Sequence, residues 1–107
     1  MPKRTDRKVT VMICRVGKPD LVTEVIDNLK TYQDIVGGHI EGYSLPMNRQ
    51  LYLYCNGDGK FLCPPNQVVG SLGMIHGDFV IVRCGKNGDA ISLTKKDIAL
   101  LIKASSK

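Results

Sequence analysis

The sequence predicts an α+β fold in a single domain, with a mainly antiparallel sheet of about five to seven strands and two short helices. Three observations predict it. Short runs rich in β-branched and aromatic residues alternate with glycine, proline and asparagine turns. Two stretches place apolar residues at helical spacing. The length of 107 residues is typical of one domain, which we assign to residues 9–103, between a basic arm at 1–8 and a tail at 104–107.

The first part of the chain predicts two successive strands. Val9–Val16 is rich in β-branched residues and apolar on both alternating faces, which is typical of a central strand. After a glycine and proline turn, Leu21–Ile26 predicts the second strand, although Leu21, Val25 and Leu29 also fit a helical stripe. The boundary between strand and helix stays open here.

A short helix and a third strand follow. Asp27 or Asn28 is suited to cap the helix, whose apolar stripe includes Tyr32 and Val36. Two successive glycines then end the helix, because glycine readily adopts the left-handed conformation of a helix end. His39–Leu45 predicts the next strand.

The middle of the chain predicts a hairpin. Gln50–Cys55 alternates leucine with tyrosine, which favours a strand with two differently occupied faces. Asn56–Gly59 indicates a tight turn, because glycine adopts positive φ without steric cost. Lys60–Cys63 is then the returning strand, and Pro64–Asn66 is expected to end it, since proline donates no ladder hydrogen bond.

The last part predicts a second hairpin and a helix. Val68–Gly77 is punctuated by glycines, which predicts short extended pieces and tight turns. Asp78–Cys84 is the clearest strand, and a glycine-rich turn joins it to a short partner at Ala90–Leu93. Thr94–Asp97 resembles a capping box with Asp in place of Glu, opening the final helix. The expected apolar face of that helix consists of Ile98, Leu101 and Ile102.

Composition limits the class of protein. Hydrophobic residues make up 43% of the chain and charged residues 23%, as in ordinary globular proteins, and this excludes disordered and membrane-embedded classes. No apolar run approaches the roughly 18 residues that span a bilayer, so we expect a cytoplasmic protein without membrane contact. The four cysteines contain no C-x-x-C spacing and are expected to be reduced, mostly buried small hydrophobes.

Positive charge is concentrated at the N-terminus. The net charge is +5, and four basic residues against Asp6 give the first eight residues +3 of it. Such an arm speeds approach to polyanions, although it also serves as a solubilising tail. Together with tyrosines on the Gln50–Cys55 strand, it supports an alternative function as a nucleic-acid-binding accessory protein. The candidate residues for this alternative are Lys3, Arg4, Arg7, Lys8, Tyr52 and Tyr54.

Side chains that could perform catalysis or bind metal are sparse and scattered. The chain has only two histidines, His39 and His76, and no cysteine lies two to four residues from another, so we expect no zinc site. A cysteine paired with either histidine would make a nucleophile, yet no surrounding signature supports that pairing. The carboxylates occur singly in turns and helix starts, where Asp is common for structural reasons. We therefore predict no enzyme activity, no metal and no cofactor.

Binding of an anion is a stronger hypothesis. Val69–Gly73 is a glycine-rich stretch followed by His76, and Asn56–Lys60 sets a cation beside glycines, so oriented amides and cations could hold an anion. Neither stretch matches a Walker loop or a Rossmann fingerprint, and each also fits a plain tight turn. The candidate ligand-binding residues are Tyr43, Lys60, Asn66, Gly70, Gly73, His76 and Arg83.

An ordered series of short motifs extends across most of the chain. They are V-G-G-H-I-E at 36–41, N-G-D-G-K at 56–60, P-P-N at 64–66, G-D-F-V at 77–80 and S-L-T-K-K-D-I at 92–98. Over roughly Val9 to Ile102 this series resembles a small domain-of-unknown-function family that is carried by phages, plasmids and conjugative elements. The stretch between Asn66 and Gly77 is longer and richer in glycine than the family pattern, so any site there is particular to this protein.

The resemblance implies a genetic setting and no enzymatic activity. Small proteins of mobile elements often act by stoichiometric binding, an analogy of setting. The resulting hypothesis is a non-catalytic phage or mobile-element protein in the cytoplasm of the host cell. It would counteract host defence by binding a host protein or by sequestering an anionic nucleotide ligand. Homo-oligomerisation is left open.

Overall fold

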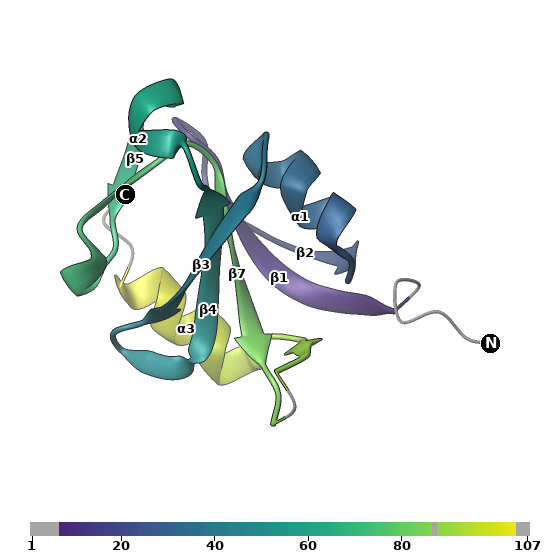
Figure 1. The fold of residues 1–107 in the computed structure, drawn as a ribbon. Coiled ribbons are helices and arrows are strands. Elements are labelled where there is room, and N and C mark those ends of the chain that lie inside the picture. The colour runs from purple at the N-terminus through teal and green to yellow at the C-terminus, as the bar shows by residue number, and fades with distance from the viewer. Residues whose placement is uncertain (1–6, 87, 105–107) are drawn as a thin grey trace.

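The computed structural model describes residues 7–86 and 88–104 and shows a central antiparallel sheet (Figure 1). The strands are β1 (Lys8–Cys14), β2 (Leu21–Ile26), β3 (Ile40–Leu45), β4 (Asn48–Asn56), β5 (Pro65–Val68), β6 (Met74–His76), β7 (Phe79–Cys84) and β8 (Ala90–Ile91). The helices are α1 (Leu29–Val36), α2 (Gly59–Leu62), the 3₁₀ helix η2 (Gly70–Leu72) and α3 (Lys95–Ala104). The predicted α+β class with a mainly antiparallel sheet is confirmed.

The central sheet has the strand order β2-β1-β7-β4-β3, and β8 pairs with the end of β7. Strands β5 and β6 form a separate two-stranded hairpin. None of the helices within the described ranges is long and apolar enough to cross a membrane. The two outer strands of the central sheet are β2 and β3, the first and last strands in this order.

Strand β7 is buried on both faces. Its Phe79 and Ile81 pack into one core with residues of β1 and β4, while Val80 and Val82 pack into a second core on the opposite face. Both Val80 and Val82 are fully buried. A strand without a solvent face requires cover on both sides of the sheet.

Different elements cover the two faces (Figure 1). Helix α1 covers the second core through Tyr32, with Ile35 packed against it. The first core is covered by Leu101 of α3 and by Ile75 of the β5–β6 hairpin. The two predicted helices thus lie on opposite faces of the sheet.

Local capping sets the helix boundaries as predicted. The Asn28 side chain accepts a hydrogen bond from Thr31 N at 2.7 Å, and Gly37 ends α1 in the left-handed conformation with φ of 81°. At the start of α3, Thr94 N donates to Asp97 Oδ2 and Asp97 N donates to Thr94 Oγ1, so the capping box is confirmed. The prediction for Ile102 is wrong, because its side chain is 62% exposed.

The predicted hairpin after β4 is wrong. Residues Gly59–Leu62 form the single-turn helix α2 in place of a returning strand. Gly57 adopts no positive φ, and the Asn56 side chain instead bonds Val36 O and Asp58 N. The Asn56 side chain thereby joins α1 to the start of α2, and a two-residue hairpin turn does not form.

The prediction that Pro64–Asn66 ends a strand is also wrong, because β5 begins at Pro65. Proline is tolerated as the first residue of a strand, where its missing N–H costs no ladder hydrogen bond. Four predicted strands are shorter than expected: β1 stops at Cys14, β3 starts at Ile40, β7 starts at Phe79 and β8 stops at Ile91. The elements themselves are as predicted.

An ion pair ties α3 to the centre of the sheet. Arg83 of β7 donates to both carboxylate oxygens of Asp97, at 2.8 and 3.0 Å, and Asp97 is only 4% exposed. Burial alone would raise the pKa of Asp97, but hydrogen bonds from Thr94 and Arg83 outweigh it and hold the pKa below its usual range.

We predict that Asp97→Asn lowers the free energy of unfolding by about 2 kcal/mol at pH 7, the size of a charge-assisted hydrogen-bond pair. A carboxylate with a lowered folded-state pKa stabilises the fold above its unfolded-state pKa, near 3.9, and loses that effect as pH falls further. The stability difference between wild type and variant should therefore shrink below about pH 4. Urea unfolding at pH 3, 5 and 7 measures it, and a constant difference across this range would contradict the assignment.

Candidate functional site

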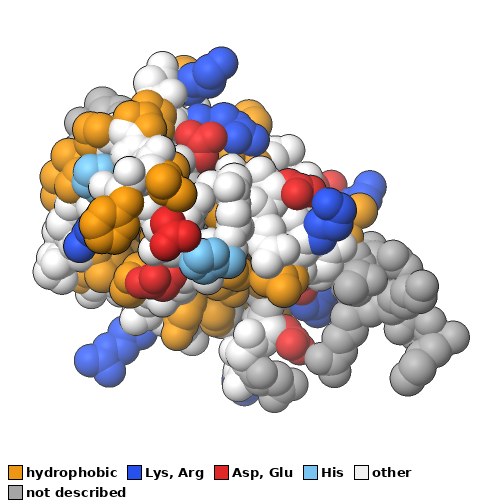
Figure 2. All heavy atoms as spheres, turned by 45° about the horizontal axis from the view of Figure 1, so that its top comes forward, with side chains coloured by type: hydrophobic (Ala, Val, Ile, Leu, Met, Phe, Trp, Pro, Cys, Tyr) orange, Lys and Arg blue, Asp and Glu red, His pale blue; other side chains and the backbone are white. Residues whose placement is uncertain are grey.

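A cleft of about 250 Å³ lies between one end of the sheet, the helix α2 and the β5–β6 hairpin. Figure 2 shows this face, where histidine and acidic side chains lie among hydrophobic ones. The residues that line the cleft are Glu41, Tyr43, Cys55, Asn56, Gly57, Gly59, Lys60, Phe61, Leu72, Met74, Ile75 and His76. They come from segments far apart in the sequence.

Strands β3 and β4 form the floor of the cleft, and their register decides which side chains face it. Glu41 pairs with Cys55 and Tyr43 with Leu53, so Glu41 and Tyr43 lie on the same face of the sheet as the first core. The β5–β6 hairpin packs on that face over β4, and residues 41–44 of β3 stay exposed. The cleft is the space between the hairpin and the side chains of β3.

Close backbone contact fixes α2 at the rim. Gly59 is buried, and a Cβ at this position would lie 2.8 Å from the His76 carbonyl oxygen of β6. A side chain there would push the helix away from the hairpin, so glycine permits the contact. Cys63 then adopts an extended conformation ahead of Pro64, which ends the helix after one turn.

The rim exposes an unusual amount of apolar side chain. Phe61 is 89% exposed and Leu62 is 73% exposed, and we call these two residues the α2 ridge. Tyr43 and Met74 beside it are also exposed. Adjacent large apolar side chains at the edge of a concavity are typical of interaction sites.

Polar groups of both signs surround this apolar surface, with acids in excess. Glu41 accepts a hydrogen bond from Tyr43 Oη, and Asp58 Oδ2 lies 3.8 Å from His39 Nε2. Gly57 separates these groups, since a Cβ there would meet both His39 and Glu41. Lys60 is the one Lys or Arg in the lining. The lining itself therefore carries one carboxylate, Glu41, and one ammonium group, Lys60, and Asp58 adds a second carboxylate beside Gly57.

Three of the seven predicted ligand-binding residues meet in the cleft: Tyr43, Lys60 and His76. Arg83 lies elsewhere, in its ion pair with Asp97. Gly70 and Gly73 bound the 3₁₀ turn, and amides of this stretch are used within it, because Leu72 N donates to Val69 O and Gly73 N to Gly70 O. The glycine-rich stretch therefore offers few amides to an anion.

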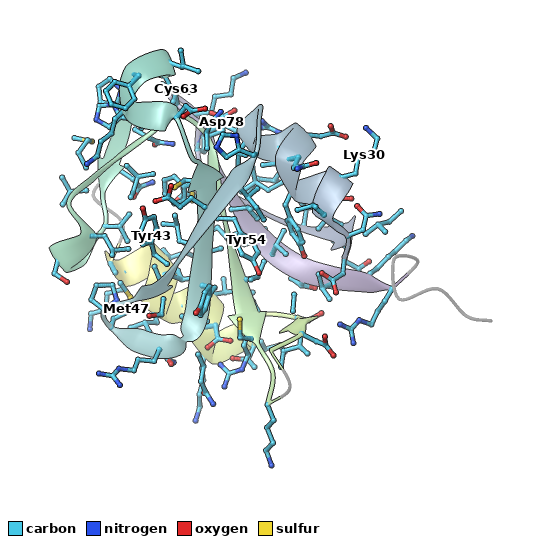
Figure 3. All side chains as sticks on the ribbon, viewed as in Figure 1. Lys30, Tyr43, Met47, Tyr54, Cys63 and Asp78 are labelled. Carbon is cyan, nitrogen blue, oxygen red and sulfur yellow. The ribbon has the colours of Figure 1, made fainter. Side chains whose placement is uncertain are left out.

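The residues of the nucleic-acid alternative are dispersed. Lys3 and Arg4 lie outside the described residues, and Lys8 is exposed at the start of β1. Arg7 donates to Asp27 and to the Ala90 carbonyl. Tyr52 and Tyr54 pack against the second core, on the opposite face from Tyr43 (Figure 3).

Tyr54 is a packing residue beneath α1. Its ring lies 5.1 Å from that of Tyr32, and burial raises its pKa above the usual value. The Tyr32 hydroxyl donates to Asp27 at 2.8 Å, and burial also raises the Tyr32 pKa. These contacts occupy the ring faces that a nucleic-acid base would need.

The thiols are dispersed as well. None of the four cysteines, all of which lie in the described ranges, forms a disulfide; Cys14 and Cys55 are buried, and Cys63 and Cys84 are half-buried. Burial raises the pKa of Cys55 and of Cys84, which opposes thiolate formation. His76 Nδ1 lies 3.3 Å from the Cys63 carbonyl oxygen. Over residues 7–86 and 88–104, no group of three His, Cys, Asp or Glu side chains is placed to hold a metal ion.

Comparison with protein families gives one match. The model of the family described as "Domain of unknown function (DUF3846)" matches residues 9–106. The chain belongs to this family. The predicted membership of a domain-of-unknown-function family is therefore confirmed for this DUF3846 domain, while the phage and plasmid setting stays a prediction. Searches of curated proteins and of solved structures found no match.

Asn66 was predicted to bind ligand, but its side-chain amide donates hydrogen bonds to two backbone carbonyl groups. Asn66 Nδ2 donates to the carbonyl oxygens of Cys14 and Gly77, both at 2.9 Å, while its buried Oδ1 has no hydrogen-bond partner in the structure. The side chain thereby joins β5 to the end of β1 and to the turn before β7. It positions the hairpin that forms one wall of the cleft.

We predict that Asn66→Ala lowers the free energy of unfolding by about 2 kcal/mol, and that Asn66→Asp lowers it further at pH 7. The carboxylate would face two carbonyl oxygens without a donor, whereas below about pH 4 its protonated form can donate to one of them. Urea unfolding at both pH values measures this, with Ser71→Asp as the control for added charge at an exposed site. Equal stability of the Ala and Asp variants at pH 7 would contradict the role.

Proposed function

We propose that this DUF3846 domain is a non-catalytic binding protein that holds a partner protein against the cleft and the α2 ridge. One observation carries the proposal: Phe61, which lines the cleft, is 89% exposed, and the next residue, Leu62, is 73% exposed. Large apolar side chains that project beside a concavity are typical anchors of protein interfaces, where few residues supply most of the binding energy.

The charges support a protein partner over an anionic nucleotide. Lys60 is the one Lys or Arg in the lining, and Glu41 lies in the same cleft with Asp58 close by. A phosphate group there would be near carboxylates, which disfavour its charge. The amides of Leu72 and Gly73 donate to the carbonyl oxygens of Val69 and Gly70 within the η2 turn, so these two amides do not compensate.

The wider setting is also part of the proposal. The motif series supports an origin in a phage or other mobile element, whose small proteins often act by stoichiometric binding. We therefore propose that the partner is a host protein, with blockage of host defence as the outcome of binding. Cys55, His76 and Glu41 all line the cleft, but the Cys55 thiol donates to the Glu41 carbonyl oxygen and burial raises its pKa. His76 Nδ1 lies 3.3 Å from the Cys63 carbonyl oxygen. These contacts support the non-catalytic part.

We predict that the double variant Phe61→Ser with Leu62→Ser loses at least about tenfold of its partner binding, as expected when interface anchors are removed. The control is Leu29→Ser with Ile102→Ser, which removes side chains of similar exposure, 58% and 62%, from α1 and α3. Affinity capture from a lysate of the native host, with quantitative mass spectrometry, measures binding. The wild type and the control should retain a protein that the ridge variant loses.

Folding and small ligands are checked in the same samples. Exposed substitutions of this kind change stability by only about 0.5 kcal/mol, so all three proteins should melt at similar temperatures. The proposal fails if no captured protein depends on the α2 ridge. It also fails if denaturation of the wild type releases a bound nucleotide whose recovery is lost with the ridge variant, because the cleft would then be a nucleotide site.

A further inference from the structure

The outer edge of β3 presents unpaired backbone groups. Gly57 N donates to His39 O at 3.0 Å, and Ile40 pairs with Asn56 in an antiparallel register. Because hydrogen-bonding residues alternate along an antiparallel strand, His39, Glu41 and Tyr43 direct their backbone groups toward β4. The N–H and C=O groups of Ile40, Gly42 and Ser44 therefore point away from β4, at the open edge of the sheet.

This edge carries few of the features that protect natural sheet edges. Glu41, Gly42, Tyr43 and Ser44 are all exposed, and β3 contains no proline and no lysine. Its one irregularity lies at the end, between Ser44 and Leu45. Natural proteins usually block such edges with Lys, Pro or a bulge, and an open edge is where an extended segment can add as a further strand.

The cleft lies along the same strand. Glu41 and Tyr43 are two residues apart on β3, so both face the cleft. Phe61 of α2 and Met74 of β6 also line it. Side chains at every second residue of an added strand would therefore reach this apolar space. The lining of the cleft draws on β3 and on no residue of β2, the other outer strand.

The charge of the site specifies the occupant. Within the described ranges Glu41 makes no ion pair, and the one ion-pair partner of Asp58 is His39, whose Nε2 lies 3.8 Å from Asp58 Oδ2. Glu41 lies on the cleft face of β3, which one face of an added strand would continue, and Asp58 follows Gly57 just after the end of β4. A lysine or arginine on that strand would complement them, and apolar residues two positions away would complement Tyr43 and Phe61.

We propose that the domain binds an extended segment of its partner protein by strand addition to β3. A basic side chain of the segment pairs with Glu41, and an apolar side chain two residues along enters the cleft between Tyr43 and the α2 ridge. This inference rests on the proposed function and adds the binding mode and the chemistry of the partner. The main-chain hydrogen bonds supply affinity, and the alternating side chains supply specificity.

A displayed library of random peptides of about nine residues, close to the length of a long strand, is the probe. Peptides enriched on the wild-type domain should carry a basic residue and an apolar residue two positions apart, on the same face of the added strand. Each is then synthesised with N-methyl groups on odd or on even residues, which block the hydrogen bonds of one edge or the other. One pattern should weaken binding about tenfold or more, because it removes several N–H donors, and the other should change it little.

Two measurements on the protein complete the test. Glu41→Lys should shift the enriched peptides from basic to acidic, since it reverses the charge that selects them. Hydrogen exchange of the Gly42 and Ser44 amides should be fast in the free domain and at least about tenfold slower with saturating peptide. The amides of Glu41 and Tyr43 are the internal control, because they already bond to β4.

The outcomes separate this inference from the proposed function. If both N-methyl patterns bind equally while Phe61→Ser with Leu62→Ser abolishes peptide binding, the domain binds protein but strand addition is wrong. If no peptide is enriched over the ridge variant, strand addition is contradicted, while the proposed function fails only if the lysate capture also yields no protein that depends on the ridge. If Gly42 and Ser44 are protected without peptide and the protein sediments as a dimer, a second copy of the chain occupies the edge, and this inference is overturned.

Discussion

Burial of β7 on both faces is the constraint from which the rest of the structure follows. Because Phe79 and Ile81 face one core and Val80 and Val82 face the other, both sides of the sheet must be covered. A short chain has few elements for this purpose. Helix α1 covers one face, while α3 and the β5–β6 hairpin share the other. The hairpin packs over β4 and leaves residues 41–44 of β3 exposed, and this strip forms both the floor of the cleft and the open edge of the sheet.

The sequence predicts most of this fold because its strands are regular. Apolar residues on both faces of Val9–Val16 indicated the interior position of β1, and the Thr94 and Asp97 capping box located α3. The error at Gly59–Leu62 has a tertiary cause. Asn56 followed by glycine is typical of a hairpin turn, yet the Asn56 side chain bonds Val36 O, which lies 20 residues away in the chain. A contact between residues so far apart in the sequence cannot be predicted from a local pattern.

The site was less predictable than the fold. Tyr43, Lys60 and His76 were predicted as ligand-binding residues and do line one cleft, but the prediction assumed an anion. The acidic groups Glu41 and Asp58 enter the site through strand register and through the turn at Gly57, which sequence spacing does not show. The α2 ridge was missed for the same reason as α2 itself, since a strand at Lys60–Cys63 would have placed Phe61 and Leu62 on opposite faces. Pro64 was the one local signal that the chain continues extended after Cys63.

Two asparagines hold the walls of the cleft in place before any partner arrives. Asn56 joins the end of α1 to the turn that begins α2, and Asn66 joins the hairpin to β1 and to the turn before β7. Gly59 seats α2 directly on the backbone of β6. A partner that binds here has little of the domain to order, so less of the interaction free energy is lost to conformational entropy. The same contacts explain why an exposed ridge of only two apolar residues can serve as an anchor: its position is set by backbone contacts on both sides, and not by the weak intrinsic stability of a four-residue helix.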